Sequence, residues 1–427
     1  LKKIIEQNQL TDFDNAIFCY TEWTEKNDPF SASSRYDHPV LDLYSLALAR
    51  ETSLSEELNN KLESDNYHDY LDVMSIQDTL QSYFNLPGSV ELLKYSKRYI
   101  ERYLDYKRRE NLVDFNDVII NTVDDNFDND RIPTFEVLII DEAQDLTDSL
   151  WSLAKKLIRK AGTVLIAGDD DQAIMINFGA SAHEFLKIKT TKKDIPLPKS
   201  FRVPPQVMRY VNAGVMQFIE ALPNRKTKEW EYADHAGSVD SISNRHSTDK
   251  DGNEYDYYEE YEINDLLREV IVKKEDQWLI MCPTRNTGAL VSNALLEQDP
   301  PIPHFYRNRP KPNLVKIEIE KDDNMKGEEE SSQITQIRVQ SIHISKGDEA
   351  DNVAIVAGGI GDIGMLVDDP RLAYVALTRA KYHLFPRVVK SGLLPSMLDN
   401  PDYEGLARKY MRMFPSERNI KGGKVFV

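Results

Sequence analysis

Two stretches of the sequence decide the fold: residues 137–145, VLIIDEAQD, and residues 164–174, VLIAGDDDQAI. In each, four apolar residues typical of a buried strand are followed by acidic residues and a glutamine. The segment between them, 148–160, has the pattern of a helix. Strand, helix and strand in this order predict a parallel sheet with crossover helices. Open sheets of this kind bind their ligands at the carboxyl ends of the strands.

The polar residues after these strands suggest phosphate chemistry. Asp141 can hold Mg²⁺ through water, and Glu142 can orient and deprotonate the water that attacks a γ-phosphate. Gln172, after the second strand, can sense the γ-phosphate or the attacking water. The alternative interpretation is structural, because acidic residues commonly cap helices and occupy turns.

A second α/β region begins near Trp278. Its expected elements are strands at 279–282, 337–340 and 353–356 and a helix at 287–297. The acidic, turn-rich stretches 249–262 and 321–330 are predicted to be exposed loops or partly disordered inserts. The chain is therefore expected to contain two α/β lobes.

Residues 1 to about 110 are predicted to be mostly helical. Over 89–109 the large side chains recur at steps of three and four, with Ser89 as the expected N-cap; they are Leu92, Tyr95, Tyr99, Tyr103 and Tyr106. The rest of this helix surface is expected to carry the basic residues Lys94, Lys97, Arg98, Arg102, Lys107, Arg108 and Arg109. Two interpretations remain open: a solvated face over a tyrosine-rich core stripe, or a contact with a nucleic-acid backbone.

Composition narrows the class of protein. The 427 residues suggest about three domains of roughly 150 residues each. The net charge of −18 argues against a nonspecific nucleic-acid coat, although an acidic body can still carry a local basic groove. Cys19 and Cys282 are too few for a disulfide framework or a thiolate zinc site. No apolar run approaches the roughly 20 residues that span a bilayer, so a soluble protein of a reducing compartment is expected.

Five motifs in order between residues 138 and 381 resemble those of the UvrD/Rep-like superfamily 1 DNA helicases. They are LIIDEAQD at 138–145, GDDDQAI at 168–174 with Gly179-Ala180, LPKSFR at 197–202, QSIHISKGDEA at 340–350 and RLAYVALTRAK at 371–381. The resemblance implies an α/β fold of two RecA-like P-loop NTPase lobes, with parallel sheets and flanking helices, plus a helical insert. It implies an ATP- and Mg²⁺-dependent helicase or translocase that moves 3′ to 5′ on single-stranded DNA.

The resemblance also implies roles for the catalytic residues. Asp141 would coordinate Mg²⁺ through water, Glu142 would be the general base, and Gln172 would read the γ-phosphate. Arg202 and Arg379 would act as arginine fingers, because two guanidiniums aimed at the transferring phosphoryl group stabilise the charge of the transition state. For each arginine the alternative is a surface salt bridge.

Further contacts with nucleotide and DNA are implied in the same way. Phe201 would stack on the adenine, Glu349 would contact the ribose, and Lys346 and Gly347 would line the nucleotide site. His343 would link nucleotide state to DNA contact. Arg98 and Arg102 of the basic helix are further candidates for DNA contact.

The sequence departs from the family pattern just before Gly179. Met175 and Asn177 stand where the family usually has a tyrosine and a tryptophan, and Phe178 follows one position later. Stacking on an aromatic ring contributes roughly 1–3 kcal/mol per base, so its loss should weaken the hold on a single strand. Phe178 either replaces this platform or belongs to the core. A second departure is a short segment, 308–333, where larger family members carry a regulatory insert.

The phosphate-binding loop Gly-x-x-x-x-Gly-Lys-Thr/Ser does not occur in the 427 residues. In the family this loop precedes the helical insert. We therefore expect the sequence to be a fragment of a longer protein, with the first lobe incomplete at its N-terminus and little ATP binding by these residues alone. The alternative is a catalytically inactive helicase-like DNA-binding or scaffold protein.

The expected organisation follows from the motifs. The predicted segments are 1–115, a helical insert and accessory DNA-contact subdomain; 116–205, the remainder of the first lobe; 206–270, a linker and the start of the second lobe with an acidic loop; 271–390, the second lobe; and 391–427, a C-terminal tail. Expected partners are single-stranded or partly duplex DNA and replication or repair proteins, without a membrane. The protein is expected to be a monomer in the cytoplasm of a prokaryotic cell or a phage-infected host.

Overall fold

The computed structural model comprises two compact units, Leu1–Thr191 (unit 1) and Lys192–Val427 (unit 2). The structure describes residues 39–64, 67–86, 88, 90–189, 195–240, 244–248, 254–258, 263–272, 276–306, 309–311, 336–388 and 393–415. The division between the units precedes the expected boundary at residue 205. Phe201 and Arg202 therefore belong to unit 2.

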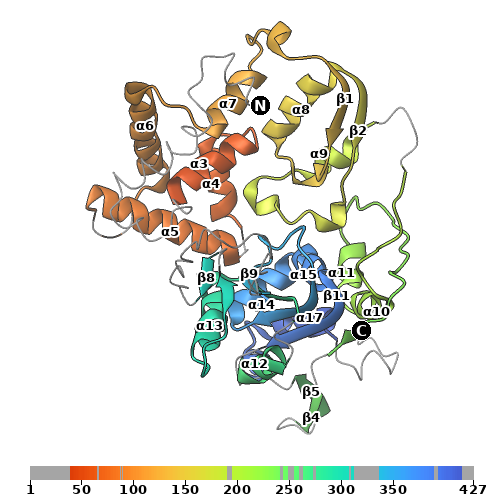
Figure 1. Cartoon of the computed structure of the whole chain (residues 1–427). Coiled ribbons are helices and arrows are strands. Elements are labelled where there is room, and N and C mark those ends of the chain that lie inside the picture. Colours follow the sequence, from red (N-terminus) through yellow and green to blue (C-terminus); the bar gives the residue numbers. More distant parts are fainter. Residues whose placement is uncertain are drawn as a thin grey trace, which may run out of the picture. The chain divides into compact units, whose positions relative to one another are not determined.

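Unit 1 begins with a group of four helices, drawn in red to brown in Figure 1. They are α3 (Pro39–Ala49), α4 (Leu54–Leu62), α5 (Tyr67–Phe84) and α6 (Leu92–Glu110). They enclose a core of buried aliphatic and tyrosine side chains, including Leu41, Leu80, Tyr99 and Tyr103. The tyrosines of α6 thus face inward, as their helical spacing predicts.

Two details of α6 differ from the sequence prediction. The helix begins at Leu92 after Glu91, which makes no side-chain capping bond, so the predicted N-cap was wrong; Ser89 itself lies outside the described residues. Lys107, expected on the surface, is only 5% exposed. Its Nζ lies 2.8 Å from Asp114 Oδ2 and 2.7 Å from Asp117 Oδ2. A buried ammonium needs such partners, and they come from the next helix.

The α/β part of unit 1 has the predicted strand-helix-strand order. Strands β1 (Phe135–Ile140) and β2 (Ala161–Ile166) pair in parallel, with Ile140 opposite Ile166. Helix α8 (Asp148–Ile158) connects them and is capped by the Thr147 side chain. The remaining elements are α7 (Phe115–Val123), α9 (Ala182–Lys187) and the short 3-10 helices η2 (Asn129–Arg131), η3 (Ala143–Asp145), η4 (Asp170–Gln172) and η5 (Ile176–Phe178). The loops after β1 and β2 therefore leave the same edge of the sheet.

Unit 2 contains a seven-stranded sheet in the order β3-β11-β10-β6-β9-β7-β8. Its strands are β3 (Ser238–Val239), β6 (Trp278–Cys282), β7 (His304–Tyr306), β8 (Arg309–Lys311), β9 (Ile337–Ser341), β10 (Ala350–Ala357) and β11 (Ala380–Val388). Every pair is parallel except β7 with β8. All residues of β6 are fully buried, which is why this central strand reads as one apolar run.

Helices surround this sheet. They are α10 (Pro205–Ala213), α11 (Met216–Glu220), α12 (Ile263–Val272), α13 (Arg285–Leu296), α14 (Ile360–Asp368), α15 (Pro370–Leu377), α16 (Leu393–Leu398) and α17 (Glu404–Met413). Helix α17, in the segment expected to be a tail, packs against α14 and α11 and buries Tyr410, Met413 and Phe414. These C-terminal residues are thus part of the core of unit 2.

The expected acidic loop 249–262 contains a strand. Strands β4 (Asn244–Thr248) and β5 (Glu254–Tyr258) form an antiparallel pair, with Asn244 opposite Tyr258. Three of the five residues of β5 are tyrosines, which favour strands, and this preference outweighs the local acidic charge. The second expected loop, 321–330, lies outside the described residues. Among the helices that the structure describes, none is long and apolar enough to cross a bilayer.

Candidate functional site

The loop after β1 places Asp141 and Glu142 at the carboxyl edge of the unit 1 sheet, with both residues exposed. Glu142 has φ +50° and ψ +41°, in the left-handed region that non-glycine residues seldom adopt. Its backbone N–H donates to Asp141 Oδ1 at 2.9 Å. Unusual backbone of this kind concentrates at functional sites, where surrounding contacts hold it in place.

Gln144 joins this loop to the loop after β2. Its Nε2 donates to Glu142 Oε2 at 2.5 Å, and its Oε1 accepts the Asp169 N–H at 2.9 Å. Gln144 itself is fully buried, so its two polar ends depend on these partners. Gly168 leaves the room for it, because a Cβ there would lie 2.6 Å from Gln144 Oε1. Sequence reasoning gave Gln144 no role; its only signal was its place between the acidic residues of the first motif.

Gln172 lies in the same connected group. Its Nε2 donates to Asp169 Oδ2 at 2.6 Å, and Asp169 Oδ1 accepts the Asp171 N–H at 3.1 Å. Three hydrogen bonds therefore connect Glu142 to Gln144, Gln144 to Asp169 and Asp169 to Gln172. Within Asp169 the connection runs from the backbone N–H to the side chain. The structure brings the expected base and the expected γ-phosphate sensor into one network.

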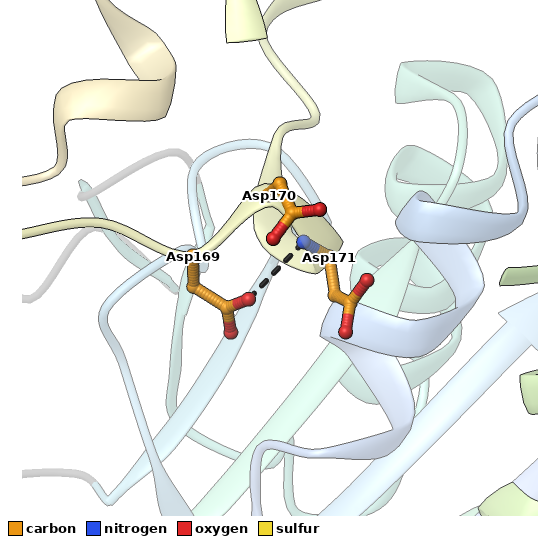
Figure 2. A group of neighbouring side chains, drawn as sticks. All are labelled: Asp169, Asp170 and Asp171. Atoms are coloured by element: carbon orange, nitrogen blue, oxygen red, sulfur yellow. Dashed lines mark hydrogen bonds between the residues drawn. The ribbon is translucent and has the colours of Figure 1, made fainter. Parts of the chain in front are cut away.

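Three carboxylates gather on the turn after β2, as Figure 2 shows for Asp169, Asp170 and Asp171. Their candidate ligand atoms lie within 4.8 Å of one another. Asp170 and Asp171 are 3% and 1% exposed. Carboxylate oxygens are the ligands that Mg²⁺ prefers. Asp141, the expected magnesium contact, is not a member of this group and lies on the neighbouring loop.

Phe178 is exposed at the end of η5, with 60% of its surface accessible. This excludes the interpretation of Phe178 as a core residue. Its turn is fixed to the helical group: Arg50 Nη2 donates to the Ile176 carbonyl at 2.9 Å, and Arg50 Nη1 pairs with Glu57 at 2.6 Å. Gly179 has φ +93°, and a Cβ there would lie 2.9 Å from Ala49 Cβ.

In unit 2, Glu349 is shared by two cations. Lys381 Nζ lies 2.7 Å from Glu349 Oε1, and Arg202 Nη1 lies 3.8 Å from Glu349 Oε2. Arg202 Nε also donates to the Thr378 carbonyl at 2.8 Å. Burial lowers the pKa of Arg202, and the negative charge of Glu349 opposes this effect. The hydrogen bond with Glu349 raises the pKa of Lys381. Sequence reasoning missed Lys381, whose only signal was its position at the end of the last motif.

Arg379 is almost completely buried, at 1% exposure. Its Nε donates to the Val375 carbonyl at 2.9 Å and its Nη2 to Thr378 Oγ1 at 3.4 Å. Arg202 and Arg379 thus converge on Thr378, one at its carbonyl and the other at its hydroxyl. Phe201, beside Arg202 in sequence, is 83% exposed.

The turn after β9 carries the other expected nucleotide contacts. His343 and Lys346 are half-buried in this turn, and Gly347 has φ +85°, which favours glycine. Arg98 and Arg102 belong to neither set and lie on the exposed face of α6. The expected residues therefore fall into a unit 1 set around Glu142, a unit 2 set around Arg202 and a basic face on α6.

The sequence is similar to known DNA helicases. Residues 9–193 match the family model of the UvrD/REP helicase N-terminal domain. The chain is 27% identical over 164 residues to the ATP-dependent DNA helicase Rep of Buchnera aphidicola subsp. Baizongia pistaciae, which covers 36% of this chain and 24% of the relative. It is 23% identical over 216 residues to the RecB subunit of the RecBCD enzyme of the same organism, covering 49% and 17%.

A solved structure of the PRRSV helicase aligns with a TM-score of 0.29 and 14% identity, over 59% of this chain and 34% of that chain. The chain spans about a quarter or less of the length of the curated relatives that it matches.

Proposed function

We propose that the protein acts in an ATP-dependent motor on DNA, because residues 9–193 match the UvrD/REP helicase N-terminal domain and the fold is RecA-like, with parallel sheets and flanking helices. The proposed movement is 3′ to 5′ along single-stranded DNA. One observation carries the proposal: Gln144 ties the loop of Glu142 to the loop of Gln172 at the carboxyl edge of a parallel sheet.

The unit 1 network supports hydrolysis of a γ-phosphate. Glu142 would deprotonate the attacking water, and its hydrogen bond with Gln144 fixes one carboxylate oxygen while the side chain stays exposed. Gln172 would contact the γ-phosphate from the second loop. Movement of either loop is passed to the other through Gln144 and Asp169, which would link recognition of the γ-phosphate to placement of the base.

A magnesium ion fits the donor set of unit 1, because exposed carboxylates follow β1 and partly buried and buried carboxylates follow β2. Asp141 would hold it through water. Bound Mg²⁺ neutralises charge on the phosphates during transfer. The chain's own contribution is to supply carboxylate oxygens on two loops that Gln144 keeps together.

The unit 2 set supports stabilisation of the transferred phosphoryl group. Arg202 and Arg379 are held through Thr378, which restricts two guanidiniums to one neighbourhood. Preorganised cations cost no reorganisation when charge develops. Phe201 would stack on the adenine, Glu349 would contact the ribose, and Lys346 and Gly347 would line the site.

Contact with single-stranded DNA would involve Phe178 and His343. The exposed ring of Phe178, on a turn fixed to α3 by Arg50, supports a role as a stacking platform. His343 lies in the turn after β9, three residues before Lys346, so one turn carries both an expected DNA contact and an expected nucleotide contact.

A second candidate function is a helicase-like DNA-binding or scaffold protein without hydrolysis. The observation that favours it is the lack of a Gly-x-x-x-x-Gly-Lys-Thr/Ser loop within the 427 residues, because this loop supplies the N–H groups and lysine that hold β- and γ-phosphates. The ordered network around Glu142 favours the motor, since a scaffold needs no aligned base.

The test is steady-state ATP hydrolysis by the full-length product of the gene, measured with and without single-stranded DNA. We expect stimulation by the DNA, and a loss of about 100-fold or more in Glu142→Gln, because the amide cannot accept the proton. Glu136→Gln, an exposed change on β1, is the matched control and should leave the rate unchanged. DNA binding without stimulated hydrolysis would instead support the scaffold.

A further inference from the structure

We propose that Lys381 is a positioning residue for the nucleotide: it holds Glu349 in place for the ribose and prevents the Glu349 carboxylate from capturing Arg202. The inference rests on the proposed function for the roles of Glu349 and Arg202. It adds the residue that allows a carboxylate for the ribose and a guanidinium for the phosphate to work side by side. All three residues belong to unit 2.

An irregularity of the unit 2 sheet brings Lys381 beside Glu349. Strands β10 and β11 run parallel, but their register shifts just after the first aligned pair. Across this shift one residue of β10, Asp351, lies opposite two residues of β11, Lys381 and Tyr382. Such bulges are rare between parallel strands and often redirect a side chain next to a functional site. His235 stabilises this bulge, because its Nε2–H donates to the Lys381 carbonyl at 2.7 Å.

Glu349 is restrained at both its backbone and its side chain. Arg338 Nη2, from β9, donates to the Glu349 carbonyl at 3.0 Å. Lys381 Nζ lies 2.7 Å from Glu349 Oε1, and this hydrogen bond raises the pKa of Lys381, so the ammonium is charged over the neutral range. The other oxygen, Oε2, has only a longer contact with Arg202, and the side chain is 42% exposed. Oε2 can therefore accept a hydrogen bond from a ribose hydroxyl.

Arg202 lies close to Glu349 without a hydrogen bond to it. Its Nη1 is 3.8 Å from Glu349 Oε2, beyond hydrogen-bonding distance, and its side chain donates instead through Nε to the Thr378 carbonyl at 2.8 Å. The Nη groups thus keep donors for a phosphate. Lys381 offsets the charge of Glu349 in this arrangement. Without Lys381, the uncompensated carboxylate would draw the guanidinium into a contact with two parallel hydrogen bonds, the strong geometry for these two groups.

The first test is steady-state ATP hydrolysis by the full-length Lys381→Met protein with single-stranded DNA. We expect kcat to fall about tenfold, because Glu349 then holds Arg202 away from the phosphate. The preference in kcat/KM for ATP over 2′-deoxy-ATP or 3′-deoxy-ATP, whichever lacks the hydroxyl that Glu349 accepts, should fall about fivefold or more. Lys155→Met is the matched control: it removes the cation of a similar pair with Glu184, at 2.8 Å, and should change neither quantity.

A second substitution separates this role from a merely structural one. In Lys381→Met/Glu349→Gln the amide carries no charge and cannot capture Arg202. We expect kcat to recover to that of Glu349→Gln alone, while the preference for ATP stays low. A kcat as low as that of Lys381→Met would overturn the proposed capture, because a packing defect is not repaired by removing a neighbouring charge.

Lys381→Arg keeps the positive charge and guards against a folding defect in Lys381→Met. We expect this variant to retain kcat and most of the preference for ATP, and a loss equal to that of Lys381→Met would contradict the inference. An unchanged kcat and preference in Lys381→Met would also overturn it and would leave the proposed function intact. Absence of DNA-stimulated hydrolysis in the wild type would instead overturn the proposed function and this inference together.

Discussion

At the scale of single residues, one buried amide organises the unit 1 site. Gln144 uses its donor for Glu142 and its acceptor for the Asp169 N–H, so both ends of the side chain are satisfied in a fully buried position. Gly168 is part of the same arrangement because its missing side chain leaves space for Gln144 Oε1. The identity of both residues follows from this contact.

Gly168→Ala should therefore destabilise unit 1 by about 1–3 kcal/mol, because the new Cβ would lie 2.6 Å from Gln144 Oε1. The cost should shrink in a Gln144→Ala background, giving a coupling free energy of about 1 kcal/mol or more in a double-mutant cycle by urea unfolding. Gly405→Ala is the control, since nothing lies within 4 Å of its added Cβ, and it should not be destabilising. Simple additivity of the two changes would contradict the contact.

At the scale of elements, a buried ion network joins α6 to α7. Lys107 of α6 contacts Asp114 and Asp117 in a capping box at the start of α7, and the Tyr103 hydroxyl donates to Asp114 Oδ2 at 2.7 Å. Burial acts to raise the pKa of Asp114, but Lys107 and the hydrogen bonds hold this pKa below its ordinary value. Burial acts to lower the pKa of Lys107, but the two carboxylates hold this pKa above its ordinary value. Both groups are therefore charged over the neutral range.

Lys107→Met should cost about 3–5 kcal/mol of unfolding free energy at pH 7, because it leaves a buried carboxylate without its cation. The pKa of Asp114 is lower in the folded protein than in the unfolded chain. Asp114 therefore contributes its whole share to the free energy of unfolding above its unfolded pKa, about 3.9, and this share is lost as pH falls through its pKa in the folded protein. The difference between wild type and Lys107→Met should accordingly narrow below about pH 4, as measured by denaturant unfolding across pH 2–7.

Lys94→Met is the matched control for this element. Lys94 belongs to an exposed pair with Glu91, at 3.5 Å, and its removal should cost less than about 1 kcal/mol at any of these pH values. A Lys107→Met difference that stays constant with pH would show that lost packing, and not the ion network, causes the effect.

At the scale of the whole molecule, the chain consists of two compact units that each carry one of the expected residue sets. Glu142 and Gln172 belong to unit 1, and Arg202, Glu349 and Arg379 to unit 2. The C-terminal helices complete unit 2 and are not an appendage. Gly214 shows how closely they approach, because a Cβ there would lie 2.2 Å from the Met413 carbonyl oxygen.

Phe414→Ala should destabilise unit 2 by about 3–5 kcal/mol, since the ring is fully buried and stacks on Tyr410 with ring centres 4.7 Å apart. Amide hydrogen exchange in β10 should accelerate accordingly. Tyr403→Ala, at a position 37% exposed, should have a much smaller effect. Unchanged exchange in β10 would mean that α17 does not contribute to the core of unit 2.

The sequence by itself determined the strands β1, β2, β6, β9 and β10, the helices α8 and α13, and the inward tyrosine stripe of α6. Each depends on a local apolar pattern, which unit 2 buries completely in β6. The expected burial of β1 and β2 was wrong, because Val137, Ile139 and Leu165 are 53%, 66% and 55% exposed in the two-stranded sheet of unit 1. The order of the motifs likewise placed Glu142 and Gln172 on loops at one edge of a sheet.

Only the tertiary structure decided which polar groups meet. Three examples join residues from different elements: the bridge from Gln144 to Asp169, the shared contact of Glu349 with Lys381 and Arg202, and the stacking of Arg98 and Arg102 on Phe84. The same holds for the burial of Lys107. Such pairings depend on distances across the fold, and spacing along the chain carries no information about them.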